Sequence, residues 1–298
     1  MGAAAANLGN ARRRLRALAL GLVTLAAAAA IGAPALAPAA AAGAVAARGA
    51  AVPAARGPAV SEPSATAATA ASCQQAFVPA YPWSSAFWTR AIDSRPAPGV
   101  MILNVTGMGA GNAPVPHFQA LVRKAHAAGV SVLGYSSTEY GRRPAAAVEA
   151  DARHYKAWYK VNGMFLDLTA NARSGLAYYR ALATYIRAAI PRSVIWLNVG
   201  AYPARGYMSV GNVVVAFEGS YASYRGLAVP AWTAHYKAAR FADVIYATPR
   251  SDLASAVSLA RHRRTGHLYV TSLPGSPDPY SALPGYWARE VAAIAAPC

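Results

Sequence analysis

Gly163-Met-Phe-Leu-Asp-Leu168 and Val213-Val-Val-Ala-Phe-Glu218 are the two stretches from which the architecture of this chain can be inferred. Each is an apolar run, too short for a helix, that reaches a carboxylate. Continuous apolar runs of this length predict strands that are buried on both faces of a parallel sheet. Asp167 and Glu218 then lie at the carboxyl ends of their strands, where a parallel barrel places its chemistry. Because a buried carboxylate is costly without a partner, these two acids mark the candidate site.

The chain from residue 73 onward alternates such runs with helix-like segments. Eight strands are predicted, at Phe77–Tyr81, Val100–Asn104, Ser131–Tyr135, Met164–Asp167, Val194–Asn198, Val213–Glu218, Val244–Ala247 and His267–Thr271. Helices are predicted at Pro116–Ala128, Pro144–Val161, Ser174–Ile190, Pro230–Arg240, Ser251–Arg264 and Ala282–Ala295. This alternation predicts a single α/β domain, the (β/α)8 TIM barrel. An open, doubly wound sheet is the alternative.

The first 72 residues differ from the rest in composition, since all 6 Trp and all 17 Tyr follow Cys73. Arginines at 12–14 and 16 precede the apolar run Ala17–Ile31 and the small residues Ala35-Leu36-Ala37. This pattern predicts a secretory signal peptide over residues 1–37. Residues 38–72 are predicted to be a disordered Ala/Pro-rich linker, and residues 73–298 the barrel domain. We therefore expect a secreted, extracellular protein without a stable membrane anchor. Retention of the apolar run as a membrane anchor is the alternative, and a location in the cell envelope stays open.

The two cysteines, Cys73 and Cys298, stand at the first and last positions of the predicted domain. In an oxidising compartment they can form a disulfide, and domain termini often lie close together. A closed barrel favours this pairing because its first and last elements are neighbours. We predict the disulfide; two unrelated thiols are the alternative.

The chain is strongly basic, with a net charge of +17. From residue 73 onward, 22 Lys and Arg less 10 Asp and Glu leave +12. Such a charge attracts anionic polymers, but it is spread along the sequence, and the one dense cluster, Arg261–Arg264, falls at a predicted helix end, where cations are favoured. We expect a monomer with no nucleic-acid partner. The six histidines show no metal-ligand spacing, so no metal and no cofactor is predicted.

The domain has few acids, and most have a structural explanation. Glu149 and Asp151 are expected on the exposed face of a helix. Only Glu139, Asp167 and Glu218 fall at or just past the carboxyl ends of strands. Two carboxylates there suit glycoside hydrolysis, in which one protonates the leaving oxygen and the other attacks the sugar or activates water. The alternative is a pair of structural acids, each bound to an arginine.

Aromatic and amide side chains mark the other strand ends and would surround the same mouth. Such groups suit a sugar, which offers hydroxyls to bond and C–H faces to stack on. The predicted substrate-binding residues are Tyr81, Asn104, Tyr135, Glu139, Tyr140, Asn198 and Tyr221. A polysaccharide is therefore the expected partner.

These residues give the chain a resemblance to the spherulin-4 family, spherulation-specific family 4. The resemblance is carried, in order, by Val78-Pro-Ala-Tyr81, Asn104 with Gly107-Met-Gly-Ala-Gly111, Gly134-Tyr-Ser-Ser-Thr-Glu-Tyr-Gly-Arg142, Gly163-Met-Phe-Leu-Asp167, Asn198-Val-Gly200 and Phe217-Glu218. It implies a barrel of glycoside-hydrolase type that cleaves galactosamine-containing exopolysaccharide internally and with retention. By this resemblance Asp167 would be the nucleophile and Glu218 the general acid/base. Tyr81, Asn104, Tyr135 and Asn198 would line the sugar site.

One position departs from the family pattern. The family usually has Asp-Glu at the end of the fourth strand, where this chain has Asp167-Leu168. The lost carboxylate points to a different substrate, a weaker enzyme or a protein that only binds its sugar. A catalytically inactive barrel that binds cell-wall or extracellular glycan is therefore the alternative function.

Overall fold

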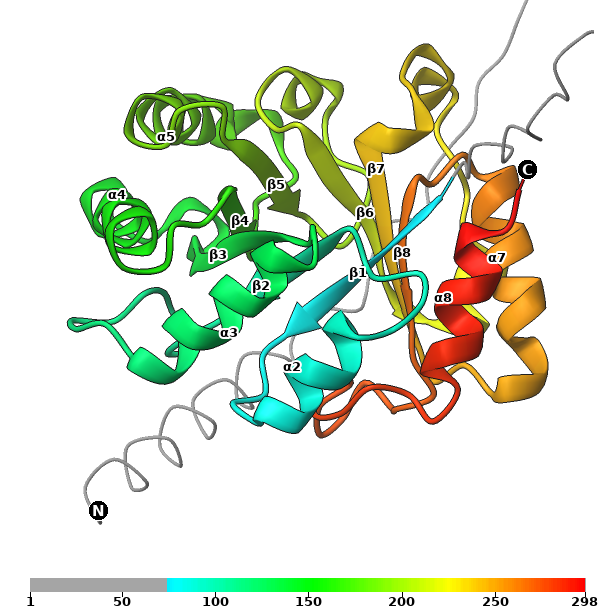
Figure 1. The fold of residues 1–298 in the computed structure, drawn as a ribbon. Coiled ribbons are helices and arrows are strands. Elements are labelled where there is room, and N and C mark those ends of the chain that lie inside the picture. Colours follow the sequence, from blue (N-terminus) through cyan, green and yellow to red (C-terminus); the bar gives the residue numbers. More distant parts are fainter. Residues whose placement is uncertain (1–73, 298) are drawn as a thin grey trace, which may run out of the picture. The chain divides into compact units, whose positions relative to one another are not determined.

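A parallel barrel of eight strands forms the core of residues 74–297, the part of the chain that this computed structural model describes (Figure 1). The strands are β1 (Gln75–Ala80), β2 (Val100–Leu103), β3 (Ser131–Ser137), β4 (Gly163–Asp167), β5 (Val194–Asn198), β6 (Val213–Ser220), β7 (Phe241–Tyr246) and β8 (His267–Val270). They follow one another around a closed sheet in chain order, and every neighbouring pair is parallel. The predicted (β/α)8 TIM barrel is confirmed.

Pairing of β1 with β8 closes the sheet. Gln75 lies opposite His267, and Ala76 lies opposite Leu268. Inside the barrel, Phe77 of β1 meets Trp196 of β5 with their ring centroids 5.1 Å apart, although the two strands are not neighbours. Both rings are fully buried. The centre of the barrel is therefore a packed core, which leaves the strand ends as the place for a site.

Helices surround the sheet, as Figure 1 shows. They are α2 (Ser85–Ile92), α3 (Pro116–Ala127), α4 (Ala145–His154), α5 (Leu176–Ala189), α6 (Tyr221–Arg225), α7 (Leu253–His262) and α8 (Trp287–Ala295). The sequence predicted all of these except α2 and α6, although α8 begins at Trp287 rather than at Ala282. The missed helices are short, but each has a serine at its N-cap, and the Ser84 side chain accepts a hydrogen bond from the Phe87 amide. A serine that can cap a helix N-terminus was the sequence signal for each of these two helices.

The helix predicted over Pro230–Arg240 is wrong. Two 3-10 turns, Ala231–His235 and Ala238–Arg240, occupy this stretch. Tyr236 between them is extended, and its ring contacts both Trp232 and Phe241. The packing of these three aromatic rings outweighs the local helix propensity, which is a weak force by comparison.

Three predictions lie outside the described residues: the signal peptide, the linker and the pairing of Cys73 with Cys298. Within residues 74–297, no helix is long and apolar enough to cross a membrane. The basic cluster at the end of α7 is partly structural, because Arg261 donates hydrogen bonds to the carbonyl groups of Ala293 and Ala296 and to the side chain of Gln74. This guanidinium therefore joins the two ends of the described domain.

Candidate active site

Asp167 and Glu218 face each other across the side chain of Asn198. Asn198 Nδ2 lies 2.7 Å from Asp167 Oδ1 and 2.7 Å from Glu218 Oε2. These two carboxylate oxygens are therefore no more than 5.4 Å apart, twice the 2.7 Å distance to the shared nitrogen. The three residues end consecutive strands β4, β5 and β6, or lie just before the end, so the order of strands around the barrel brings them together.

The backbone directs both acids toward the mouth. Asp167 is the last residue of β4 and pairs in register with Ser137 at the end of β3. In β6, the register shifts between Val215 and Phe217, immediately before Glu218. Such a bulge bends a strand and changes the direction of the side chains that follow.

The amide of Asn198 can have only one orientation here. Its two N–H groups donate hydrogen bonds to the two acids. A flipped amide would instead place its oxygen against two carboxylate oxygens. The amide oxygen, Asn198 Oδ1, is buried, and no group within residues 74–297 forms a hydrogen bond with it. Buried polar atoms are almost always satisfied, so this oxygen lacks the partner that such an atom usually has.

Each acid also accepts a hydrogen bond from a tyrosine. The Tyr135 hydroxyl lies 2.6 Å from Asp167 Oδ2, and the Tyr280 hydroxyl lies 2.5 Å from Glu218 Oε1. Tyr81 lies between the two tyrosines, with ring centroids 5.6 Å from Tyr135 and 5.1 Å from Tyr280. Three neighbouring tyrosine side chains therefore lie beside the two carboxylates.

Burial controls the ionisation of the pair. It raises the pKa of Asp167 above its ordinary value, and the hydrogen bonds from Tyr135 and Asn198 oppose this rise. It also raises the pKa of Glu218, where the charge of Asp167 adds to the rise and the bonds from Tyr280 and Asn198 oppose it. Two nearby carboxyl groups that resist simultaneous ionisation are typical of acid–base sites.

Neither acid is held by an arginine. Over residues 74–297, the ion pairs are Lys124 with Asp93 and Arg143 with Asp151. The alternative of two structural acids, each bound to an arginine, therefore does not describe this pair. No group of three His, Cys, Asp or Glu side chains in the same part of the chain could hold a metal ion.

The other residues predicted for the site are less closely placed. Tyr140 is 52% exposed, and partial burial together with the charges of Asp167 and Glu218 raises its pKa, so it stands near the pair. Asn104 instead caps its own loop, because its Oδ1 accepts the Gly107 amide at 2.7 Å. Glu139 contributes to the raised pKa of Tyr178 on α5, not to that of either acid. Tyr221 begins α6 and lies under the guanidinium of Arg225, 5.8 Å from its ring centroid.

Sequence reasoning missed Tyr280. It lies in the irregular stretch between β8 and α8, in a Pro-rich turn that ends no strand. Its contact with Glu218 spans 62 positions of the chain, so the local pattern says little about its role. Only the Asp-Pro-Tyr sequence of residues 278–280, a turn that holds an aromatic residue, was a weak signal.

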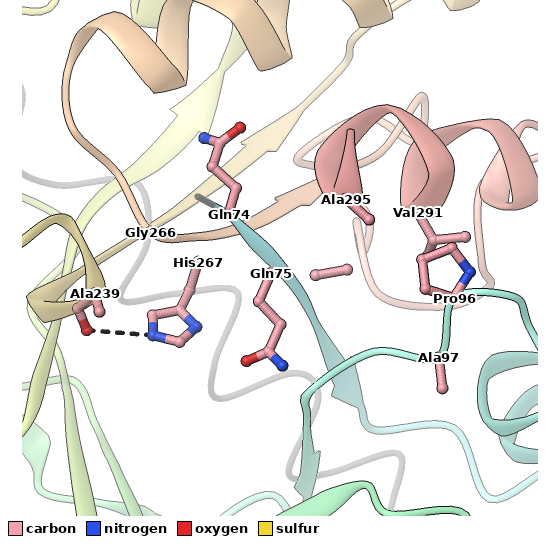
Figure 2. Close-up of a pocket in the computed structure, with 10 residues that line it drawn as sticks. Gln74, Gln75, Pro96, Ala97, Ala239, Gly266, His267, Val291 and Ala295 are labelled. Carbon is pink, nitrogen blue, oxygen red and sulfur yellow. Dashed lines mark hydrogen bonds between the residues drawn. The ribbon is translucent and has the colours of Figure 1, made fainter. Parts of the chain in front are cut away.

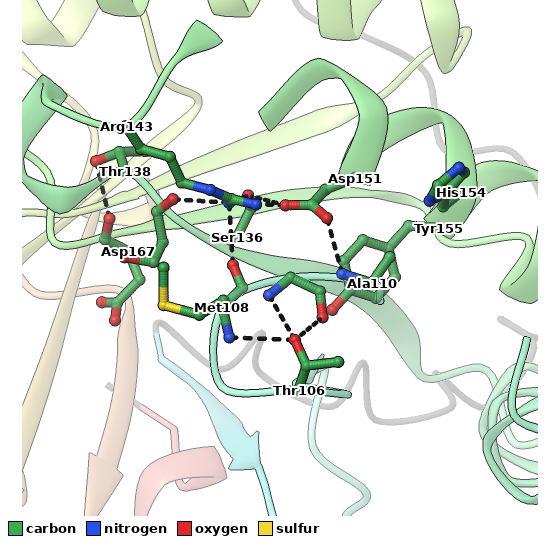
Figure 3. A network of polar contacts seen from close by, with 12 residues as sticks. Thr106, Met108, Ala110, Ser136, Thr138, Arg143, Asp151, His154, Tyr155 and Asp167 are labelled. Carbon is green, nitrogen blue, oxygen red and sulfur yellow. Dashed lines mark hydrogen bonds and ion pairs between the residues drawn. The ribbon is translucent and has the colours of Figure 1, made fainter. Parts of the chain in front are cut away.

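The sequence analysis placed Asp151 on the exposed face of its helix, and this prediction is wrong. It is buried, and it forms an ion pair with Arg143 at 2.7 Å while accepting hydrogen bonds from Ser136 Oγ and the Ala110 amide (Figure 3). Arg143 also donates to the carbonyl of Met108 at 3.0 Å. The pair therefore ties the glycine-rich loop after β2 to β3 and α4.

This network places Met108 at the mouth. Its carbonyl accepts from the Ser137 amide as well as from Arg143, and its side chain is 38% exposed. Figure 3 shows the side chain pointing toward Asp167. Gly109 permits the close approach of the loop, since a Cβ there would lie 2.1 Å from Asp151 Oδ2.

Leu168, at the position where a second acid was expected, is partly exposed and has a positive φ of 47°. Its carbonyl accepts the Thr138 hydroxyl at 2.8 Å and the Tyr140 amide at 2.7 Å. A left-handed conformation costs a leucine roughly 1–2 kcal/mol, and these two bonds help to offset that cost. The backbone after Asp167 is therefore fixed, although this position carries no charge.

A cavity of about 440 Å³ lies at the opposite end of the barrel. Figure 2 shows it between Gln75, at the start of β1, and His267, at the start of β8, with Gly266 and Ala97 nearby. These residues precede or begin their strands, whereas both acids lie near strand ends. The cavity is therefore separate from the carboxylate pair.

Comparison with known proteins agrees with this architecture. Residues 75–294 match the model of spherulation-specific family 4. Spherulin-4 of Physarum polycephalum is 26% identical over 229 residues, which cover 73% of this chain and 69% of that protein.

Two solved structures show the same fold. Sph3 of Aspergillus clavatus, solved in complex with GalNAc, superposes with a TM-score of 0.67 at 23% identity, over 76% of this chain and 98% of that one. A chitinase from Rhizomucor miehei superposes with a TM-score of 0.50 at 11% identity, over 74% of this chain and 100% of that one. The barrel thus has a glycoside-hydrolase-like fold, and the match over residues 75–294 shows that the chain belongs to spherulation-specific family 4.

Proposed function

We propose that this protein is a secreted glycoside hydrolase that cleaves an extracellular polysaccharide with retention of configuration. The observation that carries the proposal is the shared contact of Asp167 and Glu218 with the amide of Asn198. Two contacts of 2.7 Å limit the facing oxygens to a separation of 5.4 Å. This limit suits the spacing of about 5–5.5 Å in retaining enzymes, whereas inverting enzymes need roughly 6.5–9.5 Å to admit a water molecule.

In the first step, Asp167 attacks the anomeric carbon and Glu218 donates a proton to the leaving oxygen. The glycosidic bond breaks, and an ester forms between the sugar and Asp167. In the second step, Glu218 removes a proton from water, which attacks the anomeric carbon and releases Asp167 as a carboxylate.

The ionisation of the pair supports these roles. Burial and the charge of Asp167 both raise the pKa of Glu218, which favours the protonated form required in the first step. When Asp167 becomes an ester, its charge is lost and the pKa of Glu218 falls. Glu218 can then act as the base, as the second step requires.

A galactosamine-containing polymer is the substrate that we propose. Membership of spherulation-specific family 4 supports this choice, as does the solved complex of Sph3 with GalNAc. The exposed ring of Tyr140 offers a surface for a sugar face.

The test is hydrolysis of partly acetylated galactosamine polymer by the purified protein. We expect new reducing ends, and proton NMR of the first product should show the anomer of the substrate linkage. First release of the opposite anomer would contradict retention. Absence of any product over a panel of hexosamine polymers would contradict the hydrolase.

A second function is favoured by Leu168, which leaves the site with two acids where the family pattern has three. In this alternative the barrel binds glycan without cleaving it. Saturable binding of the polymer by calorimetry, with no reducing ends released during prolonged incubation, would support it over the hydrolase.

Export and the disulfide form part of the same proposal. The residue pattern over 1–37 supports a signal peptide. Pairing of Cys73 with Cys298 is supported by Arg261, which contacts Gln74 beside one cysteine and Ala296 two positions from the other. Mass spectrometry of the secreted protein, with and without reductant, would reveal both the mature N-terminus and the bridge.

A further inference from the structure

We propose that Tyr280 is the residue that positions Glu218, a role that rests on the proposed hydrolase function. Its hydroxyl fixes one oxygen of the carboxylate while Asn198 fixes the other, at 2.5 Å and 2.7 Å respectively. With both oxygens held, the carboxylate cannot rotate about its terminal bond. Glu218 is thereby oriented toward Asp167 before any substrate arrives.

Tyr280 reaches Glu218 from a segment that is distant in sequence. It lies in residues 271–286, which join β8 to α8, whereas Glu218 belongs to β6. Its ring packs edge-on against Tyr81, with centroids 5.1 Å apart, and lies 6.4 Å from Tyr269. The hydroxyl is therefore brought to the acid by a rigid aromatic side chain with neighbours on two sides.

The backbone around Tyr280 is anchored without the hydroxyl. The Tyr280 amide donates to Asp278 Oδ1 at 2.8 Å, and the Ala247 amide donates to the carbonyl of Leu273 at 2.8 Å. Farther along, the Tyr286 hydroxyl donates to the carbonyl of Thr248 at 2.9 Å. The first bond orders the turn itself, and the other two hold the segment to the residues that follow β7, so the Tyr280 hydroxyl is not required to keep it in place.

The contact with Glu218 also has an electrostatic consequence. A hydrogen bond donated to a carboxylate favours its ionised form, and the bond from Tyr280 opposes the rise in pKa that burial and Asp167 impose on Glu218. The titratable and polar groups around Glu218 come from several elements: Tyr81, Tyr140, Asp167, Asn198, Tyr246 and Tyr280. None of these is a cation, so Tyr280 and Asn198 are the groups that stabilise the ionised form.

The variant Tyr280→Phe tests this role, because it removes the hydroxyl and keeps the ring. We expect kcat to fall about tenfold, since a loosely held catalytic group loses rate even after a small displacement. The alkaline limb of the pH profile, which reports the protonated acid, should move to higher pH. The matched control is Tyr286→Phe, which removes a hydroxyl bond from the same segment without touching Glu218.

A direct measurement separates this role from the hydrolase proposal. The chain has five glutamates, so carboxyl carbon NMR of glutamate-labelled protein can follow Glu218, assigned by its absence in Glu218→Gln. In Tyr280→Phe this signal should titrate at higher pH than in the wild type and in Tyr286→Phe.

The outcomes are distinct. An unchanged titration of Glu218 together with an unchanged kcat in Tyr280→Phe would overturn the positioning role. Equal losses of activity in Tyr280→Phe and Tyr286→Phe would do the same, because they would reflect the segment and not the contact. A shifted titration in a protein that releases no sugar would keep the role of Tyr280 and reject the hydrolase.

Discussion

Arg143 and Asp151 form a buried ion pair that holds the glycine-rich loop beside the candidate site. Their closest atoms are 2.7 Å apart, and their side chains are 14% and 8% exposed. Removing one partner of a buried pair leaves an uncompensated charge. We expect Asp151→Asn to lower the free energy of unfolding by about 3 kcal/mol, measured by urea denaturation.

A matched control for this prediction is the exposed pair between Lys124 and Asp93, which has the same type of contact at 3.1 Å. Asp93→Asn should cost less than about 1 kcal/mol, because solvent screens an exposed pair. Equal costs at the two pairs would contradict the structural role of Asp151. Asp151→Asn should also raise KM more than Asp93→Asn does, because only the first change frees the loop that carries Met108.

The two acids should be essential for turnover and dispensable for folding. Asp167→Asn and Glu218→Gln keep the size of each side chain, and burial already disfavours the charge at both positions. We therefore expect each variant to lose at least about 1,000-fold in kcat, since each removes a reacting group. The melting temperature should stay unchanged or rise slightly, as measured by calorimetry.

Glu149→Gln is the control, because this glutamate lies on α4 and is not among the groups that shift the pKa of either acid. It should leave both activity and melting temperature unchanged. A large fall in melting temperature for Asp167→Asn or Glu218→Gln would instead indicate that the pair is structural.

Loss of the Tyr135 hydroxyl should shift the acid limb of the pH–activity profile, whereas loss of the Tyr280 hydroxyl should shift the alkaline limb. Its hydroxyl donates to Asp167 and so opposes the rise in the pKa of that acid. In Tyr135→Phe the pKa of Asp167 should rise. Because the nucleophile must be ionised, the acid limb of kcat/KM should move to higher pH, measured with a soluble oligosaccharide. A shift of the alkaline limb alone would reverse the roles proposed for the two acids.

Stability below neutral pH should depend on His267. Burial lowers the pKa of this histidine to about 4 in the folded chain, whereas an unfolded histidine has a pKa of about 6.5. The unfolded chain therefore binds the extra proton between these values. The contribution of His267 is complete above about pH 6.5 and is lost as the pH falls toward 4, a change of about 3 kcal/mol.

Asp243 acts in the opposite direction over nearly the same range. Burial raises its pKa to about 6, so the folded chain holds the proton and stability falls as the pH rises from about 4 to 6. Urea denaturation across the range from about pH 4 to about pH 7 should show a flatter acid loss in His267→Gln and a steeper one in Asp243→Asn. Identical pH dependence in the wild type and both variants would contradict these assignments.

The fold could be predicted because its signal is local. Each strand is a short apolar run, and strands that alternate with helices pair in chain order, so the sequence also brings the ends of β4, β5 and β6 together. This is why the residue pattern was enough to assign Asp167, Asn198 and Glu218 to one mouth of the barrel. The stretch Pro230–Arg240 shows the limit, because the packing of Trp232 against Phe241, the first residue of β7, replaced the helix that its composition favoured.

The residue pattern alone was sufficient for the barrel, for the position of the two acids and for the tyrosines that follow β1 and lie in β3. Contacts in three dimensions settled which groups hold each acid and which acids are structural. Tyr280 meets Glu218 from an irregular segment 62 positions away, and Asp151 turns inward to meet Arg143. The physical reason is that periodicity fixes which face of a strand or helix is buried, whereas the path of a loop and the rotamer of a polar side chain depend on contacts between distant residues.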